Sequence, residues 1–135
     1  MIGTPETIER VLRYDVWAVV GLTSNTARPA YGVARFLQQH GKRIVPVNPR
    51  AEPVHGEPGF AALADIPFPV DVVDIFRRSE FAGAHVDEAV SIGARAVWLQ
   101  LGVIDEPAAA RAAAAGLDVV MDHCPVIEWP AHGPV

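Results

Sequence analysis

Five short apolar runs, separated by stretches of helical pattern, constrain the fold of this chain more than any other feature. The runs cover residues 17–22, 43–47, 70–76, 95–101 and 117–121. Runs of this length are typical of strands that are buried on both faces of a sheet. Helical patterns lie at 31–40, 58–65, 79–93 and 105–116. Because such alternation gives parallel strands joined by right-handed crossovers, we predict an α/β, Rossmann-like, three-layer domain with a five-stranded parallel sheet.

The two ends of the chain are expected to belong to the same single domain, residues 1–135. A chain of 135 residues that is 50% hydrophobic can build one well-buried core but not two. Thr4 and Pro5, followed by apolar residues at helical spacing, predict a first helix at about 4–14. The tail, about 125–135, contains Pro130 and Pro134 and is predicted to be irregular.

The charge of the chain excludes some partners. A formal net charge of -5 and a pI of about 5.4 argue against general binding to nucleic acid or to anionic membranes. No apolar stretch approaches the roughly 20 residues that span a bilayer, and the N-terminus lacks a secretion signal, so we expect a cytoplasmic protein. Cys124 has no second cysteine to pair with, and the five histidines show no paired metal-ligand spacing. We therefore expect neither a disulfide nor a metal site.

Polar and basic residues follow the predicted strands. After the first strand, Gly21 and Leu22 lead into a polar loop that reaches Tyr31, and Gly32 follows in a helical pattern. A helix start of this kind offers free backbone N–H groups to a phosphate. Four of the 11 Lys and Arg residues fall just after strands, namely Arg28, Arg50, Arg77 and Arg78. Because strand ends in such sheets form the ligand site, this placement predicts a pocket for a polyanionic small molecule.

Two common nucleotide fingerprints are absent. The spacing from Gly21 to Gly32 does not fit GxGxxG, and Val47 is followed by Asn48 and Pro49 rather than by the acid that binds ribose in NAD sites. There is no GxxxxGK[ST] loop for ATP or GTP. The sequence therefore disfavours an NAD site and sets aside a P-loop protein.

An ordered set of motifs carries a resemblance to a known family. The motifs are Gly21-x-Thr23-Ser24-Asn25 with Pro29-x-Tyr31-Gly32, Pro46-Val47-Asn48-Pro49, Phe76-Arg77, Trp98-Leu99-Gln100-Leu101-Gly102 and Asp122-His123-Cys124-Pro125. Over roughly residues 14 to 129 the chain resembles the stand-alone CoA-binding domain family, which is similar to the N-terminal domain of the succinyl-CoA synthetase alpha subunit. The resemblance implies a Rossmann fold with coenzyme A lying across the strand ends. Ser24 stands where the synthetase pattern has a glycine, so the phosphate contacts are expected to differ there.

The resemblance, together with position after the strands, selects the candidate ligand-binding residues. The loop from Gly21 to Arg28 would approach the phosphates, and Phe76 is the candidate for stacking on adenine. The full set is Gly21, Thr23, Ser24, Asn25, Thr26, Arg28, Tyr31, Gly32, Asn48, Pro49, Arg50, Phe76, Arg77, Leu99, Gln100, Leu101, Gly102 and Cys124. Cys124 has two interpretations, a small buried apolar residue or a thiol that forms a mixed disulfide with CoA under oxidation.

The expected function is binding of coenzyme A or an acyl-CoA by a non-catalytic, regulatory module. No catalytic residues are assigned, because no histidine matches the phosphorylated histidine of the synthetases and we expect no second domain that would carry it. Asp71 and Asp74 lie three apart on a predicted strand, on opposite faces, and cannot converge as an acid/base pair. The open alternatives are an NAD(H)-binding regulatory domain, a CoA-binding subunit with a partner catalytic subunit, a domain that has lost its ligand, and a homodimer.

Overall fold

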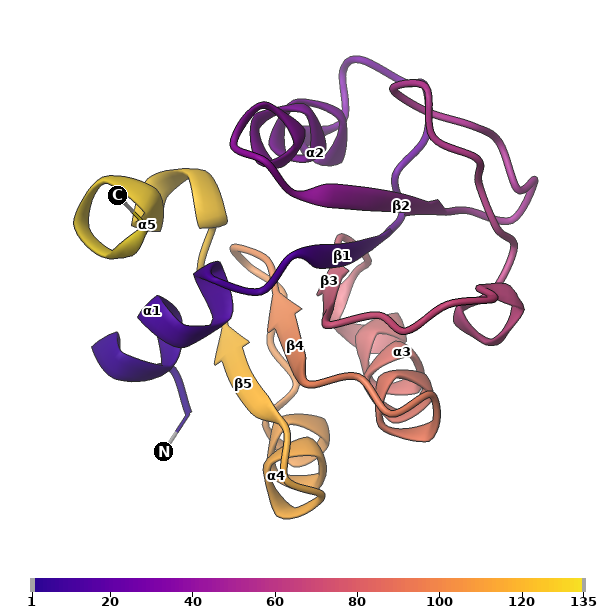
Figure 1. Cartoon of the computed structure of the whole chain (residues 1–135). Coiled ribbons are helices and arrows are strands. Elements are labelled where there is room, and N and C mark those ends of the chain that lie inside the picture. The colour runs from indigo at the N-terminus through magenta and orange to yellow at the C-terminus, as the bar shows by residue number, and fades with distance from the viewer. Residues whose placement is uncertain (1, 135) are drawn as a thin grey trace.

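A five-stranded parallel sheet forms the centre of the computed structural model, which describes residues 2–134 (Figure 1). The strands are β1 (Val16–Val20), β2 (Arg43–Val47), β3 (Val72–Ile75), β4 (Ala96–Leu99) and β5 (Asp118–Met121). They lie side by side in the order β2-β1-β3-β4-β5, and every neighbouring pair is parallel. The α/β fold with a five-stranded parallel sheet is therefore confirmed, with strands shorter than most of the apolar runs that predicted them.

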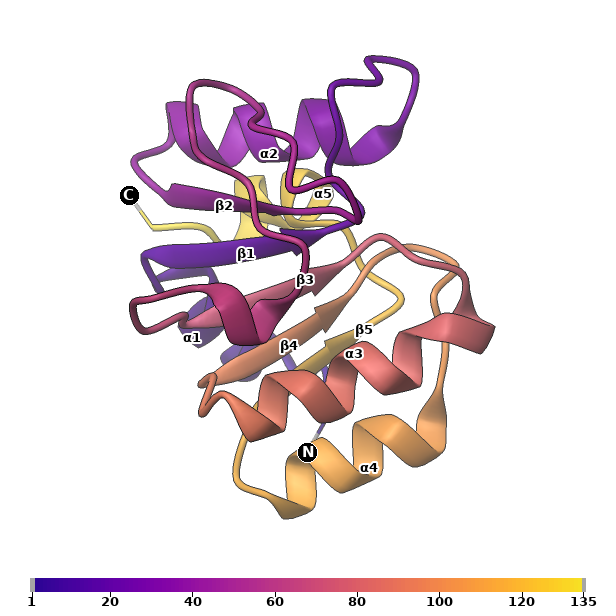
Figure 2. The same cartoon turned by 90° about the vertical axis from the view of Figure 1, so that its right-hand side faces the viewer.

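Helices cover both faces of the sheet and make the three layers (Figures 1 and 2). They are α1 (Pro5–Leu12), α2 (Pro29–Gln39), α3 (Ser79–Ser91), α4 (Glu106–Ala114) and α5 (Pro125–His132), with a short 3-10 turn, η1 (Leu63–Asp65). Helices α1, α2 and α5 pack on one face, and α3 and α4 on the other. None of the helices in the described part of the chain is long and apolar enough to cross a bilayer.

The strands place alternate side chains in two separate cores. On β1, Ala18 and Val20 face the core under α3 and α4, whereas Trp17 and Val19 face the core under α1, α2 and α5. This is the period of two expected for a strand that is buried on both sides. The apolar runs of the sequence are continuous because helices cover both faces of the sheet.

Side chains at two helix starts act as the sequence predicts. Thr4 caps α1, its hydroxyl accepting a hydrogen bond from the Thr7 N–H at 3.2 Å. Asp105 caps α4 in the same way, accepting from the Ala108 N–H at 3.0 Å. Ser79, which begins the helical pattern at 79–93, is the first helical residue of α3 and not its N-cap. Its hydroxyl donates to the Gly102 carbonyl and accepts from the Ile104 N–H, so it ties α3 to the loop that follows β4.

The prediction of an irregular tail at about 125–135 was wrong for most of that segment. Residues Pro125–His132 form α5, with Pro125 at the start, where a missing N–H costs nothing. Pro130 removes one hydrogen bond inside the helix, but the Trp129 ring packs 5.6 Å from the ring of Phe36 on α2. This tertiary contact outweighs the local preference of proline. Residue 135 lies outside the described residues.

The helix predicted at 58–65 was also largely wrong. Of that segment, the structure has the 3-10 turn Leu63–Asp65, and Phe60 forms an isolated parallel bridge with Val47. Backbone hydrogen bonds to the end of β2 explain the difference, because the Phe60 N–H donates to the Pro46 carbonyl at 3.0 Å and the Phe60 carbonyl accepts from the Asn48 N–H at 3.0 Å. Gly59 also lies so close to the Glu52 carbonyl oxygen that a Cβ would not fit there. The segment is therefore held as an extended chain against the residues that follow β2.

Candidate functional site

The order of the strands reverses between β1 and β3. The chain passes from β1 to β2 on one side and then returns to β3 on the other side of β1. Such a switch point opens a crevice beyond the carboxyl ends of the two strands. Gly21 follows β1 at this point with φ +94°, and a Cβ here would lie 2.8 Å from the Phe76 carbonyl oxygen. Glycine is therefore required by both the backbone conformation and the close approach of the two strand ends.

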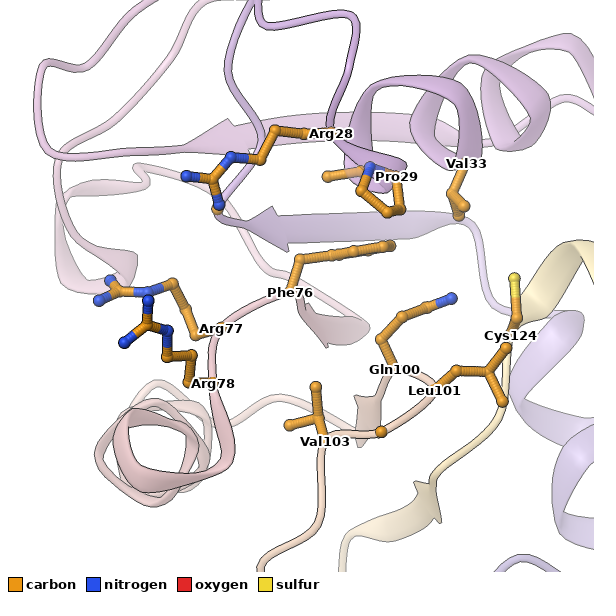
Figure 3. A pocket seen from close by; sticks show the side chains of 13 residues that line it. Arg28, Pro29, Val33, Phe76, Arg77, Arg78, Gln100, Leu101, Val103 and Cys124 are labelled. Atoms are coloured by element: carbon orange, nitrogen blue, oxygen red, sulfur yellow. The ribbon is translucent and has the colours of Figure 1, made fainter.

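A pocket of about 410 Å³ opens at this crevice (Figure 3). Figure 3 shows three guanidinium groups at one end and the side chains of Gln100 and Cys124 at the other, with Phe76 between them. The lining residues are Gly21, Arg28, Pro29, Ala30, Val33, Phe76, Arg77, Arg78, Gln100, Leu101, Gly102, Val103 and Cys124. The pocket thus joins a cationic end to a mainly apolar end.

Two more hollows adjoin this pocket toward β2. The second, of about 360 Å³, shares Gly21, Arg28 and Arg77 with the first pocket and adds Thr23, Asn25 and Asn48, among others. The third, of about 350 Å³, shares Thr23, Asn25, Asn48 and Pro49 with the second and adds Ser24, Arg50 and Glu52. Because neighbouring hollows share lining residues, we treat the three as one groove along the carboxyl ends of β2, β1 and β3.

Hydrogen bonds within the chain order the polar loop that follows β1. The Thr23 hydroxyl accepts from the Asn25 N–H at 3.2 Å, and the Asn25 side chain accepts from the Ala27 N–H at 3.0 Å. The Ser24 N–H donates to Glu52 Oε1 at 2.8 Å. The loop is therefore shaped by its own polar residues, and three of its backbone N–H groups are engaged by side chains.

The arginines of the groove are largely without acidic partners. Arg78 lies 3.7 Å from Glu80, with both side chains well exposed. The Arg77 guanidinium lies 5.1 Å from the centre of the Phe81 ring, a cation-π contact that holds it at the rim. Within residues 2–134, no carboxylate forms a salt bridge within 4.0 Å of Arg28, Arg50 or Arg77. Their charge is available to an anionic ligand.

Buried polar groups lie at and behind the apolar end of the pocket. Gln100 is 7% exposed and its Oε1 has no hydrogen-bond partner. Asp74 is 0% exposed, neither carboxylate oxygen has a partner, and burial raises its pKa well above 3.8. Asp74 pairs with Trp98 across the sheet, so it lies on the same face as Trp98 and as Gln100, which directly follows β4. Cys124 is 7% exposed and unpaired.

The structure gathers most of the predicted site residues in the groove. Gly21, Arg28, Phe76, Arg77, Gln100, Leu101, Gly102 and Cys124 line the first pocket, and Thr23, Ser24, Asn25, Asn48, Pro49 and Arg50 line the two adjoining hollows. Thr26, Tyr31, Gly32 and Leu99 line none of the three. Leu99 is fully buried in the core under α3 and α4, and the Tyr31 carbonyl accepts from His55 Nε2 at 2.8 Å.

Sequence reasoning missed several residues that shape the groove. Ala30 and Val33 lie three apart on α2 and face the pocket, a spacing that the helical period could have identified. Asp122 has φ +62° and accepts from the Gly102 N–H at 2.7 Å, which fixes the loop after β4. Glu52 carries no signal in the sequence, because its contact with Ser24 spans 28 positions.

Comparison with known proteins identifies the family of this chain. Residues 15–130 match the family described as the CoA binding domain. This chain belongs to the CoA binding domain family. The resemblance found in its motifs is thereby confirmed. The uncharacterized protein YneT of Bacillus subtilis is 35% identical to this chain over 107 residues, which is 79% of each protein.

Solved structures show the same fold as this CoA binding domain. A hypothetical protein from Pyrococcus horikoshii superposes with a TM-score of 0.90 at 34% identity, covering 96% of this chain and 92% of the other. A Thermus thermophilus protein gives a TM-score of 0.87 at 33% identity, with coverage of 94% and 97%. A dinucleotide-forming acetyl-coenzyme A synthetase from Ca. Korarchaeum cryptofilum shares the fold, with a TM-score of 0.74 at 22% identity, over 85% of this chain and 28% of the synthetase.

Proposed function

We propose that this chain binds coenzyme A, or an acyl-CoA, in the groove and acts as a non-catalytic binding or regulatory module. The observation that carries the proposal is the position of Arg28 and Arg77, which line both the first pocket and the second hollow. The two guanidinium groups thus lie between the polar hollows toward β2 and the apolar end of the first pocket. CoA has the same order of groups, since its diphosphate joins a nucleotide to the pantetheine arm. Arginine is well suited to hold phosphate oxygens in a bidentate manner.

The polar part of the groove suits the nucleotide. Thr23 and Asn25 supply a hydroxyl and an amide group there, and Arg50 adds a positive charge at its far end. A ribose phosphate would be favoured near Arg50. The Phe76 ring lines the first pocket and neither of the polar hollows, and it offers an aromatic face next to the guanidinium groups.

The apolar part suits the pantetheine arm. Val33, Leu101 and Val103 provide apolar contacts for its methylene and methyl groups. The Gln100 amide lies among them, where it can exchange hydrogen bonds with the amides of the arm. Cys124 lies at the same end, where the thiol of the ligand would arrive.

The lining of the first pocket supports a binding role rather than catalysis. The residues that line it include no histidine, aspartate or glutamate. His85 lines the second hollow, but its Nδ1 lies 2.8 Å from Glu88 Oε1 on the same helix. No carboxylate or imidazole therefore lines the pocket that would hold the thiol end of the ligand.

Native mass spectrometry tests the proposal. The purified protein is mixed with CoA, dephospho-CoA or NAD at equal concentration, and the retained ligand is identified from the mass of the complex. We expect CoA to be retained in preference to NAD. Retention of NAD without CoA would overturn the proposal.

One observation favours the NAD(H) alternative. The Glu52 carboxylate lies beyond the end of β2, where an acid can accept hydrogen bonds from a ribose. The comparison of CoA with NAD therefore decides between the two. The further alternative, a CoA-binding subunit of a ligase, is tested by co-purification from the native cell, which would yield a stoichiometric second protein.

A further inference from the structure

Glu52 contacts the loop that the proposed function assigns to the phosphates of the ligand. Its Oε1 accepts a hydrogen bond from the Ser24 N–H at 2.8 Å. Both residues line the third hollow, together with Arg50. A carboxylate oxygen on a backbone N–H makes the same type of charge-assisted hydrogen bond as a phosphate oxygen. Glu52 thus occupies a position that an anionic ligand could use.

The backbone of Glu52 is held in place by several contacts. The Glu52 N–H donates to Asn48 Oδ1 at 2.8 Å, and Asn48 Nδ2 donates to the Glu52 carbonyl at 3.0 Å and to the Leu22 carbonyl at 2.9 Å. Asn48 is buried, so this clamp joins the ends of β1 and β2. Ala51 has φ +52°, and Gly59 passes so close to Glu52 that no side chain fits there. The position of Glu52 is therefore built into the fold.

The Glu52 side chain is ionised and only half-buried at the third hollow. Its hydrogen bonds with Ser24, and then the charge of Arg50, lower the pKa of its carboxyl below the usual value. It is therefore negatively charged at neutral pH. The side chain lies at the surface of the hollow, so it can turn into water without breaking the Asn48 clamp on its backbone.

We propose that Glu52 is an internal anion that holds the Ser24 N–H in the unliganded protein and that a phosphate group of the ligand displaces it. This inference rests on the proposed function. A phosphate brings more charge and more acceptor oxygens than a carboxylate, and Arg50 and Arg28 lie along the same groove to receive it. A ligand without a phosphate at this point cannot compete with Glu52. The residue therefore sets both the affinity and the preference for a phosphorylated ligand.

Isothermal titration calorimetry of Glu52→Gln tests the inference. Glutamine keeps the size and the acceptor oxygen but loses the charge, so its hydrogen bond to Ser24 is weaker. We expect CoA to bind about three- to tenfold more tightly to Glu52→Gln than to the unmodified protein. The matched control is Glu57→Gln, which removes the same charge from the same connection between β2 and β3. We expect the control to leave the affinity for CoA unchanged.

A parallel titration with dephospho-CoA identifies which phosphate of CoA displaces Glu52. If the ribose phosphate displaces Glu52, the substitution increases the affinity for CoA more than the affinity for dephospho-CoA. If the diphosphate displaces Glu52, the substitution increases both affinities equally. An unchanged or weaker affinity of Glu52→Gln for CoA would overturn the inference while leaving the proposed function intact. Absence of CoA binding by the unmodified protein would overturn the proposed function itself. Inorganic diphosphate provides a probe that needs no CoA. At equal concentration it should shift the NMR signal of the Ser24 amide more in Glu52→Gln than in the unmodified protein.

Discussion

Asp74 lies in the middle of β3, between Val19 of β1 and Trp98 of β4, with a side chain that water does not reach. Neither of its oxygens has a hydrogen-bond partner, and burial raises the pKa of the carboxyl well above 3.8. An ionised carboxylate in this environment would be unpaired and desolvated. The folded protein therefore keeps the proton on Asp74 at pH values where the unfolded chain has lost it.

The pH dependence of stability follows from this difference in proton binding. Above about pH 3.8 the folded state binds more protons than the unfolded state, so the free energy of unfolding falls as the pH rises toward the raised pKa of Asp74. The contribution of this one group has a slope of about 1.4 kcal/mol per pH unit in that window. Asparagine has nearly the same shape and cannot ionise. We therefore predict that Asp74→Asn is more stable than the unmodified protein near neutral pH, with a difference that shrinks as the pH falls.

Urea unfolding, followed by the fluorescence of the buried Trp17 and Trp98, measures this prediction. Unfolding curves are recorded from about pH 4 to about pH 7 for both proteins, and the difference in free energy is plotted against pH, so that contributions of other groups cancel. Asp65→Asn makes the same charge change at an exposed position of η1 and serves as the control. A difference between Asp74→Asn and the unmodified protein that is constant over this range would refute the reasoning.

Three further predictions concern the groove. Arg77→Ala should weaken CoA binding more than tenfold in calorimetry without lowering the melting temperature, whereas Arg35→Ala, at an exposed position on α2, should not; equal affinities would remove Arg77 from the site. Gly21→Ala should destabilise the fold by about 1–3 kcal/mol in urea unfolding, because φ +94° and the Phe76 carbonyl oppose a side chain; unchanged stability would contradict that geometry. With diamide as oxidant, the thiols of Cys124 and CoA should join in a disulfide that intact-mass analysis detects. No adduct, or an adduct that persists in Cys124→Ser, would exclude Cys124 as the reacting thiol.

Much of the fold could be predicted because its signals are local. The apolar runs identify the strands, since a strand covered on both faces needs apolar side chains at every position. Thr4 and Asp105 mark helix starts through hydrogen bonds to residues only three positions away. The helix α5 could not be found in this way, because its stability depends on Trp129 packing against a ring on α2.

The candidate site was predicted in part for the same reason. Residues such as Arg28 and Arg77 follow strands directly, and parallel strands bring their carboxyl ends to one edge, so position along the chain indicates position in space. Leu99 was misplaced because a strand end looks the same in sequence whether its side chain enters the core or the groove, and here it enters the core. Glu52 was missed because no short-range pattern links it to Ser24.

The amino-acid sequence by itself determined the alternation of strands and helices, most of the helix starts and the gathering of basic residues at one edge of the sheet. These features depend on hydrophobic period, capping hydrogen bonds and strand direction, which act over a few residues. The tertiary structure alone decided that a carboxylate from one loop holds an amide of another, and that Asp74 is sealed between two strands without a partner. Both depend on which distant segments pack together, and that packing sets the solvent exposure and the electrostatic environment of each group.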